Sequence, residues 1–317
     1  MKKALVVGID YYQHTEDLNG CVNDAHDIES ILERHGDGTK NFDVQLLCGT
    51  SDIAAVSKKD LKSAVIALFA ENNEIALFYF AGHGYIESTG GYLLTSDACE
   101  GDEGLSMDDI LQLANDSPAK NKIIILDCCH SGRMGDVNFK KNHALLSEGI
   151  TILTASSKTQ YAQEVGGSGV FTRLLVDALS GSAANLTGDV TPGSVYAHID
   201  QSLGSWEQRP IFKTNVTSFT TLRKVQPPIS LEDLRKLNVL FQVKGENFPL
   251  DPEYEPESGC ARQGKVEKFK ILQKFNRVNL VVPDGAEHMY GAAMESKSCK
   301  MTILGEHYWN LLDKKRI

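Results

Sequence analysis

The sequence has no hydrophobic run long enough to cross a bilayer. Its longest apolar run, Ile75–Ala81, contains seven residues, far fewer than the roughly 20 that a membrane-spanning helix needs. The basic start, Met1–Lys3, leads into an apolar stretch, Ala4–Ile9, that ends at once at Asp10, so we expect a first strand there and no signal peptide. These features predict a cytoplasmic protein that does not enter membranes.

Proline is scarce, and the cysteines form no recognisable pattern. The 317 residues include 9 prolines and 7 cysteines, and 42% of the chain is hydrophobic against 23% charged. This composition is typical of a folded globular protein and excludes disordered and fibrous classes. An odd number of cysteines without a CxxC pair excludes a disulfide scaffold and a zinc ribbon, so we expect most thiols to be buried.

Phosphate-binding glycine motifs and a basic face are also missing. Gly8 stands alone after the first apolar run, with neither a GxGxxG nor a GxxxxGK[ST] pattern, so no nucleotide cradle is indicated. Residues 1–225 carry 18 Lys+Arg against 29 Asp+Glu, whereas residues 226–317 carry 14 against 13. A net charge of about −11 on the first part favours cationic ligands. The basic end, Lys314–Arg316, is too small a patch to predict nucleic-acid binding.

Short apolar runs recur along the first part of the chain and predict strands. These runs are Lys3–Ile9, Asp43–Leu47, Ile75–Phe80, Lys122–Leu126 and Gly149–Ala155, with a last strand at Arg209–Asn215. Because the runs are almost continuously apolar, both faces of their sheet should be covered, as in a parallel sheet. Helical spacing lies between them at Asp24–Glu33, Lys59–Phe69, Phe171–Leu179 and Val195–Leu203. The alternation predicts a doubly wound α/β fold.

Two consecutive prolines mark the expected domain boundary. Pro227 and Pro228 remove backbone donors and restrict the residue before them. We therefore expect one domain over residues 1–225 and a smaller C-terminal domain over residues 226–317. In the second we expect an acidic extended loop at Phe248–Glu257 and a terminal amphipathic helix.

Reactive side chains follow two of the predicted strands. One strand ends at Phe80 and continues into Ala81-Gly82-His83-Gly84; another ends at Leu126 and continues into Asp127-Cys128-Cys129-His130-Ser131-Gly132. Sites in open parallel sheets lie beyond the carboxyl ends of strands, so His83 and Cys129 would meet there if the strands are neighbours. A thiol beside an imidazole is a nucleophile with its base.

The same loops offer donors for an oxyanion, and they allow other interpretations. The backbone N–H groups of Gly84 and Cys129 could stabilise the negative charge that develops during acyl transfer. Single His and Cys residues at strand ends more often pack or cap than catalyse. A zinc site at His130 would need further ligands, and no such cluster is visible.

These motifs resemble those of a known family. Phe78–Gly84 and Asp127–Gly132 are similar to the histidine and cysteine motifs of caspase-like cysteine peptidases, especially metacaspases and their bacterial relatives. Val7–Tyr12, Gly20–Ala25 and Gly169–Thr172 extend the resemblance over roughly residues 1–225. It implies a caspase-like three-layer sandwich with a mainly parallel central sheet. Cys129 lacks the flanking residues of caspases, so cleavage after Asp is not implied.

The resemblance implies a cysteine endopeptidase with a Cys129–His83 dyad that cuts protein substrates after Arg or Lys. Asp24 and Asp127 correspond to the acidic residues that bind the cationic side chain, as charge-assisted hydrogen bonds would allow. Helix or strand capping explains either carboxylate equally well. Ala81 stands where some relatives have a pocket serine, and Cys128 stands where many have serine; we expect Cys128 to be buried.

Regulation is implied by the resemblance alone. Many metacaspases need Ca²⁺, although the dyad chemistry requires no cofactor, and carboxylates suit that ion. The corresponding residues here are Asp97, Asp108, Asp109 and Asp136. A solvated acidic face explains the same residues. Relatives often cleave themselves in the region of Arg133–Glu148.

Bacterial relatives with extra domains often act in defence or programmed cell death. The resemblance therefore implies a regulated protease that a partner protein or a second messenger switches on, and it assigns no role to the C-terminal domain. The alternative is a catalytically silent caspase-like scaffold that recruits a partner through that domain.

Overall fold

The computed structural model describes residues 1–87, 90–102, 104–128, 145–155, 169–203 and 209–317. These residues form two compact units. The first comprises Met1–Ala184 and Asp189–Gln226, and the second comprises Asn185–Gly188 and Pro227–Ile317. The chain passes from one unit to the other beside the two prolines that marked the expected boundary.

The first unit is built on a six-stranded sheet with the order β10-β8-β7-β3-β1-β2. Its strands are β1 (Lys2–Ile9), β2 (Asp43–Gly49), β3 (Ile75–Ala81), β7 (Asn121–Asp127), β8 (Ile150–Thr154) and β10 (Ile211–Asn215). All neighbours are parallel except β10, which pairs antiparallel with β8 at the edge. Every residue of β3 is buried, which explains why the central strands are continuously apolar.

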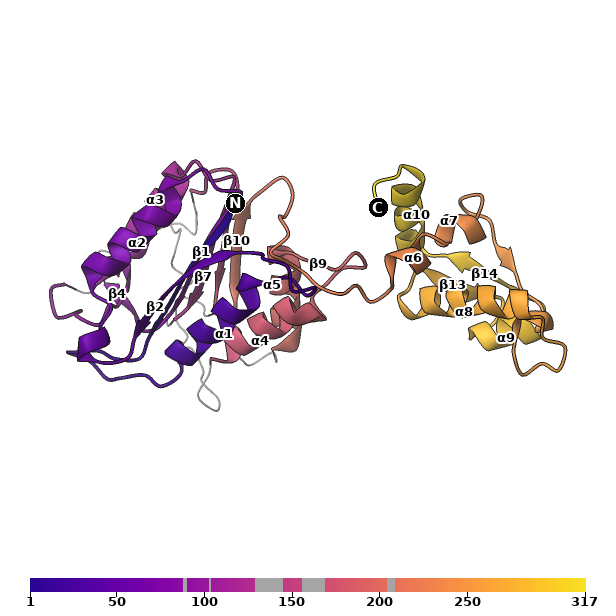
Figure 1. The fold of residues 1–317 in the computed structure, drawn as a ribbon, viewed down its shortest axis with the longest axis horizontal. Coiled ribbons are helices and arrows are strands. Elements are labelled where there is room, and N and C mark those ends of the chain that lie inside the picture. Colours follow the sequence, from indigo (N-terminus) through magenta and orange to yellow (C-terminus); the bar gives the residue numbers. More distant parts are fainter. Residues whose placement is uncertain (88–89, 103, 129–144, 156–168, 204–208) are drawn as a thin grey trace. The chain divides into compact units, whose positions relative to one another are not determined.

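Helices cover both faces of this sheet (Figure 1). One face carries α1 (Cys21–Glu33), α4 (Val170–Asp177) and α5 (Pro192–Ser202); the other carries α2 (Lys58–Ala70) and α3 (Met107–Asp116). Alternate strand residues enter the two cores, Phe78 and Phe80 on the α2 side and Tyr79 on the α1 side. The mainly parallel three-layer α/β sandwich is therefore confirmed.

Short elements complete the first unit. A small antiparallel sheet follows β3, and its strands are β4 (Gly84–Glu87), β5 (Gly90–Leu93) and β6 (Leu105–Ser106). A second pair consists of β9 (Asp189–Val190) and β11 (Arg223–Lys224). A 3-10 turn spans Asp52–Ala54, and a π-helical turn over Ala178–Ser182 follows α4.

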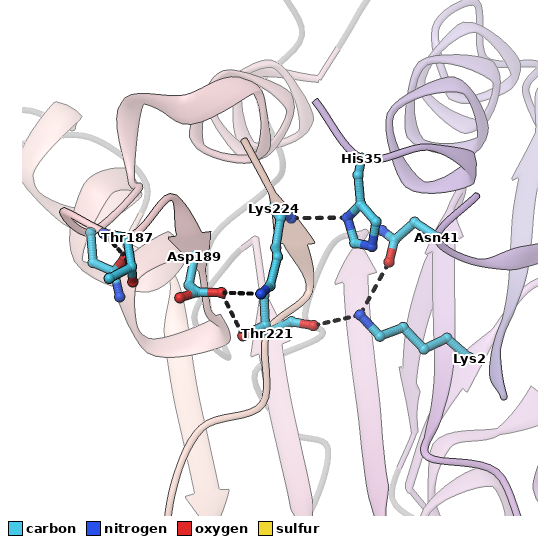
Figure 2. A network of polar contacts seen from close by, with 8 residues as sticks. Lys2, His35, Asn41, Thr187, Asp189, Thr221 and Lys224 are labelled. Carbon is cyan, nitrogen blue, oxygen red and sulfur yellow. Dashed lines mark hydrogen bonds and ion pairs between the residues drawn. The ribbon is translucent and has the colours of Figure 1, made fainter. Parts of the chain in front are cut away.

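The segment Thr221–Lys224, which leads out of the first unit, is fixed by polar contacts (Figure 2). The Lys2 ammonium donates to the Thr221 carbonyl at 2.9 Å and to Asn41 Oδ1 at 3.1 Å. The Lys224 N–H donates to His35 Nδ1 at 3.0 Å. This end of the unit is therefore anchored near the amino ends of β1 and β2.

The second unit has its own core. Its strands β12 (Phe248–Pro249), β14 (Ser298–Met301) and β13 (Val281–Asp284) form an antiparallel sheet in that order. Its helices are α6 (Leu231–Leu234), α7 (Leu237–Leu240), α8 (Gln263–Arg277), α9 (Met289–Met294) and α10 (Ile303–Asp313). The expected terminal helix is α10, whereas the expected extended loop contains β12 and a 3-10 turn at Pro252–Tyr254.

Among the described residues, none of the helices combines the length and the apolar character that a bilayer crossing requires.

Candidate active site

The two strands that lead to the predicted dyad are neighbours. β3 and β7 run parallel, with Ala81 beside Asp127, and the Gly82 N–H lies 3.4 Å from the Asp127 carbonyl oxygen. His83 follows the end of β3 by two residues, and Cys129 follows the end of β7 by two. Cys129 and His130 lie outside the described residues. The expected adjacency of the strands is confirmed, and the meeting of His83 with Cys129 stays a prediction.

The loop after β1 orients His83. His83 Nε2 lies 2.9 Å from the Glu16 carbonyl oxygen. Because a carbonyl can only accept, Nε2 carries the ring hydrogen and Nδ1 is left to exchange a proton. The His83 N–H donates to the Tyr12 hydroxyl at 2.8 Å, and the two rings pack with their centroids 4.7 Å apart. Burial raises the pKa of Tyr12 well above its usual range, so this hydroxyl stays neutral.

The same loop fixes the start of α1. The residue before the helix is Gly20, which offers no side-chain cap. Asp10 Oδ1 instead accepts the N–H groups of Cys21 at 2.8 Å and Val22 at 3.4 Å, satisfying two donors that the helix leaves open. Burial raises the pKa of the Asp10 carboxyl despite these bonds. The anchored helix then places Asp24, in its first turn, against the carboxyl ends of the strands.

Asp24 and Asp127 converge although they are far apart in the sequence. Both side chains are buried, with 3% and 7% of each residue exposed. Gly169, at the start of α4, donates its N–H to Asp24 Oδ2 at 2.9 Å. A Cβ atom added to Gly169 would lie 3.1 Å from Asp24 Oδ2 and 2.4 Å from Asp127 Oδ2. Gly169 therefore packs directly against both carboxylates, and any larger residue there would clash with Asp127.

Two residues that sequence reasoning missed hold Asp127. The Thr172 hydroxyl donates to Asp127 Oδ2 at 2.7 Å, and the Tyr79 hydroxyl lies 2.6 Å from the Thr172 hydroxyl oxygen. Burial, and then the negative charges of Asp127 and Asp24, raise the pKa of Tyr79 well above its usual range. Tyr79 belongs to a continuous apolar run, so nothing in the sequence pattern singled out its hydroxyl.

Three further residues of the predicted motifs lie near the ends of β3 and β7. Cys128 is 1% exposed and packs in the core on the α2 side, as expected for a small buried residue. Ala81 is fully buried at the end of β3. Gly84 is the first residue of β4 and follows His83 directly. The oxyanion role of Gly84 and Cys129 stays a prediction.

Three of the predicted calcium ligands, Asp97, Asp108 and Asp109, lie among the described residues. Asp97 Oδ1 accepts the Thr95 hydroxyl at 2.7 Å and the Lys58 N–H at 3.0 Å. Asp108 and Asp109 lie in the first turn of α3, capped by a serine. Asp136 lies outside the described residues, as does Arg133–Glu148 up to residue 144. Within the part of the chain that is described, no three His, Cys, Asp or Glu residues gather to hold a metal ion. Calcium activation stays a prediction.

Comparisons with known proteins identify the family and the fold of the first part of the chain. Residues 1–236 match the family described as the caspase domain. Metacaspase-6 of Arabidopsis thaliana is 31% identical over 149 residues, which are 43% of this chain and 39% of that protein. Metacaspase-1 of Kluyveromyces lactis is 27% identical over 161 residues, 44% of this chain and 35% of that protein. The chain therefore covers well under two thirds of either metacaspase.

A crystal structure of a Geobacter sulfurreducens protein aligns with 71% of this chain and with 100% of its own. The TM-score is 0.51 and the identity is 18%, so this likeness concerns the fold alone.

Proposed function

Since the chain belongs to the caspase-domain family of cysteine peptidases, we propose that it hydrolyses peptide bonds that follow arginine or lysine. Cys129 is the nucleophile, and His83 is its acid–base partner. Asp24 and Asp127 bind the cationic side chain that precedes the cleaved bond.

The convergence of Asp24 and Asp127 is the observation that carries this proposal. Two carboxylates that converge on Gly169 offer hydrogen-bond acceptors and no donor. A guanidinium or ammonium group complements them by charge-assisted hydrogen bonds. A neutral side chain brings no positive charge to these carboxylates, and an acidic side chain would be repelled by them. The net charge of about −11 on residues 1–225 also attracts a cationic substrate.

The placement of His83 supports the chemistry. The thiolate of Cys129 attacks the carbonyl carbon, and the bond from that carbon to nitrogen breaks as His83 gives a proton to the leaving amine. Water then hydrolyses the thioester, with His83 as the base. The Glu16 carbonyl holds the ring through Nε2, so that Nδ1 is the nitrogen that serves both steps.

Reporter peptides that differ only in the residue before the cleaved bond test the proposal. We expect cleavage after arginine and lysine, and little after citrulline, which has the shape of arginine without its charge. Cys129→Ala should abolish cleavage, whereas Cys128→Ala is the matched control and should keep it. An unchanged preference for cationic residues in both Asp24→Ala and Asp127→Ala would remove the assignment of the pocket.

A further inference from the structure

Thr172 connects a buried tyrosine to one of the two pocket carboxylates. Tyr79, Thr172 and Asp127 form a row of hydrogen bonds of 2.6 Å and 2.7 Å, and the three residues are 0%, 1% and 7% exposed. We propose that Thr172, oriented by Tyr79, is a positioning residue for substrate selection, which holds the Asp127 carboxylate in the orientation that binds a cationic side chain. The inference rests on the proposed function of this pocket.

The protons in this row can be arranged in only one way. An ionised carboxylate has no proton to donate, so the single hydroxyl proton of Thr172 points to Asp127 Oδ2. The Tyr79 hydroxyl must then donate to the Thr172 oxygen. Tyr79 keeps its proton because burial and the nearby carboxylates raise its pKa. The row therefore has a direction, from Tyr79 through Thr172 to Asp127.

The hydrogen bond from the Thr172 hydroxyl counters the repulsion between the two carboxylates. Two carboxylates close together and away from water repel each other, and one of them tends to take up a proton. A protonated carboxyl would bind a guanidinium poorly. Each carboxylate instead receives a hydrogen bond from the first turn of α4, Asp24 from the Gly169 N–H and Asp127 from the Thr172 hydroxyl. The positive end of the helix adds to the same effect.

Both hydrogen-bond donors to the two carboxylates lie at the start of the same helix, α4. Gly169 is the N-cap of α4, and Thr172 is its third residue. Tyr79, in the middle of a fully buried strand, orients the Thr172 hydroxyl through the hydrogen bond between them. Hence the Thr172 hydroxyl sets the orientation of the Asp127 carboxylate, while the Gly169 N–H holds Asp24.

Binding of uncut peptides to the full chain with Cys129→Ala tests this inference. Two fluorescent peptides would be used, identical except for arginine or citrulline before the scissile bond, and their dissociation constants measured by anisotropy. We expect Thr172→Val to weaken binding of the arginine peptide about tenfold or more and to reduce the ratio of arginine to citrulline affinity. Thr172→Ser keeps the hydroxyl and should restore that ratio. Tyr79→Phe should give a smaller loss of the same kind.

Thr151→Val is the matched control. Thr151 is as buried as Thr172, at 2% exposed, and its hydroxyl pairs with Thr214 at 2.9 Å at the other end of the sheet. It should leave both dissociation constants unchanged, although it removes a buried hydroxyl in the same way. Melting temperatures of the variants show whether each is folded, and Tyr79→Phe, which keeps the ring volume, serves if Thr172→Val does not fold.

The two claims fail in different ways. If the Cys129→Ala chain binds the arginine and citrulline peptides equally, the proposed function of the pocket is wrong. If it prefers arginine but folded Thr172→Val and Tyr79→Phe keep the full preference, the pocket stands and the role of Thr172 is overturned.

Discussion

Replacing Gly169 with alanine should displace the Asp127 carboxylate from its position in the pocket. The added methyl group would lie 2.4 Å from Asp127 Oδ2, about 1 Å closer than ordinary van der Waals contact. The carboxylate must therefore move by about 1 Å, a displacement that can cost on the order of 100-fold in rate. Gly169 has φ −66° and ψ 134°, which alanine adopts freely, so the effect is steric.

Initial rates on the arginine reporter measure this effect. We expect kcat/KM to fall about 100-fold, while the free energy of unfolding falls by about 1–3 kcal/mol because the added methyl group overpacks a buried site. Gly264→Ala in α8 is the control, because its added Cβ would meet no atom within 4 Å. If Gly169→Ala cleaves the arginine reporter within twofold of the unmodified chain, Asp24 and Asp127 do not form the pocket.

Three further outcomes are expected. The purified chain should cut itself within Arg133–Glu148, as mass spectrometry of its fragments would show; the same fragments from Cys129→Ala would refute this. Tyr12→Phe removes the acceptor of the His83 N–H, so kcat should fall several-fold and the free energy of unfolding by about 1–2 kcal/mol; an unchanged kcat and melting temperature would contradict the role of this bond. In the second unit, two lysines lower the pKa of Asp233 to about 2. Asp233→Asn should therefore destabilise that unit by about 1 kcal/mol at pH 7, since the lysines are partly exposed. Calorimetry should show this difference shrinking as pH falls from about 4 to about 2; a difference at pH 2 as large as that at pH 7 would exclude this cause.

The central sheet could be predicted because its strands are short, continuously apolar and separated by helical spacing. β3 is the clearest example, since all of its residues are buried. The expected strand at Arg209–Asn215 is β10, although its antiparallel direction carries no signal in so short a segment. The terminal helix was also found, whereas β12 was assigned to a loop because a two-residue strand has no periodicity.

The candidate site was only partly accessible from the sequence. Asp24 and Asp127 were paired by resemblance, and no local spacing could have shown that α1 and β7 bring them to Gly169. Thr172 belongs to the Gly169–Thr172 motif, but its bond to Asp127 depends on how α4 approaches β7. The Glu16 carbonyl beside His83 is a backbone group, which a sequence pattern cannot single out.

The most direct test of the central claim is to incubate the full chain with a mixture of unfolded proteins and to identify the residue that precedes each cleaved bond. Mass spectrometry of the new termini would identify it. The account predicts arginine or lysine at nearly all sites, and loss of those sites with Cys129→Ala. Cleavage without a preference for cationic residues, or cleavage that persists in Cys129→Ala, would contradict it.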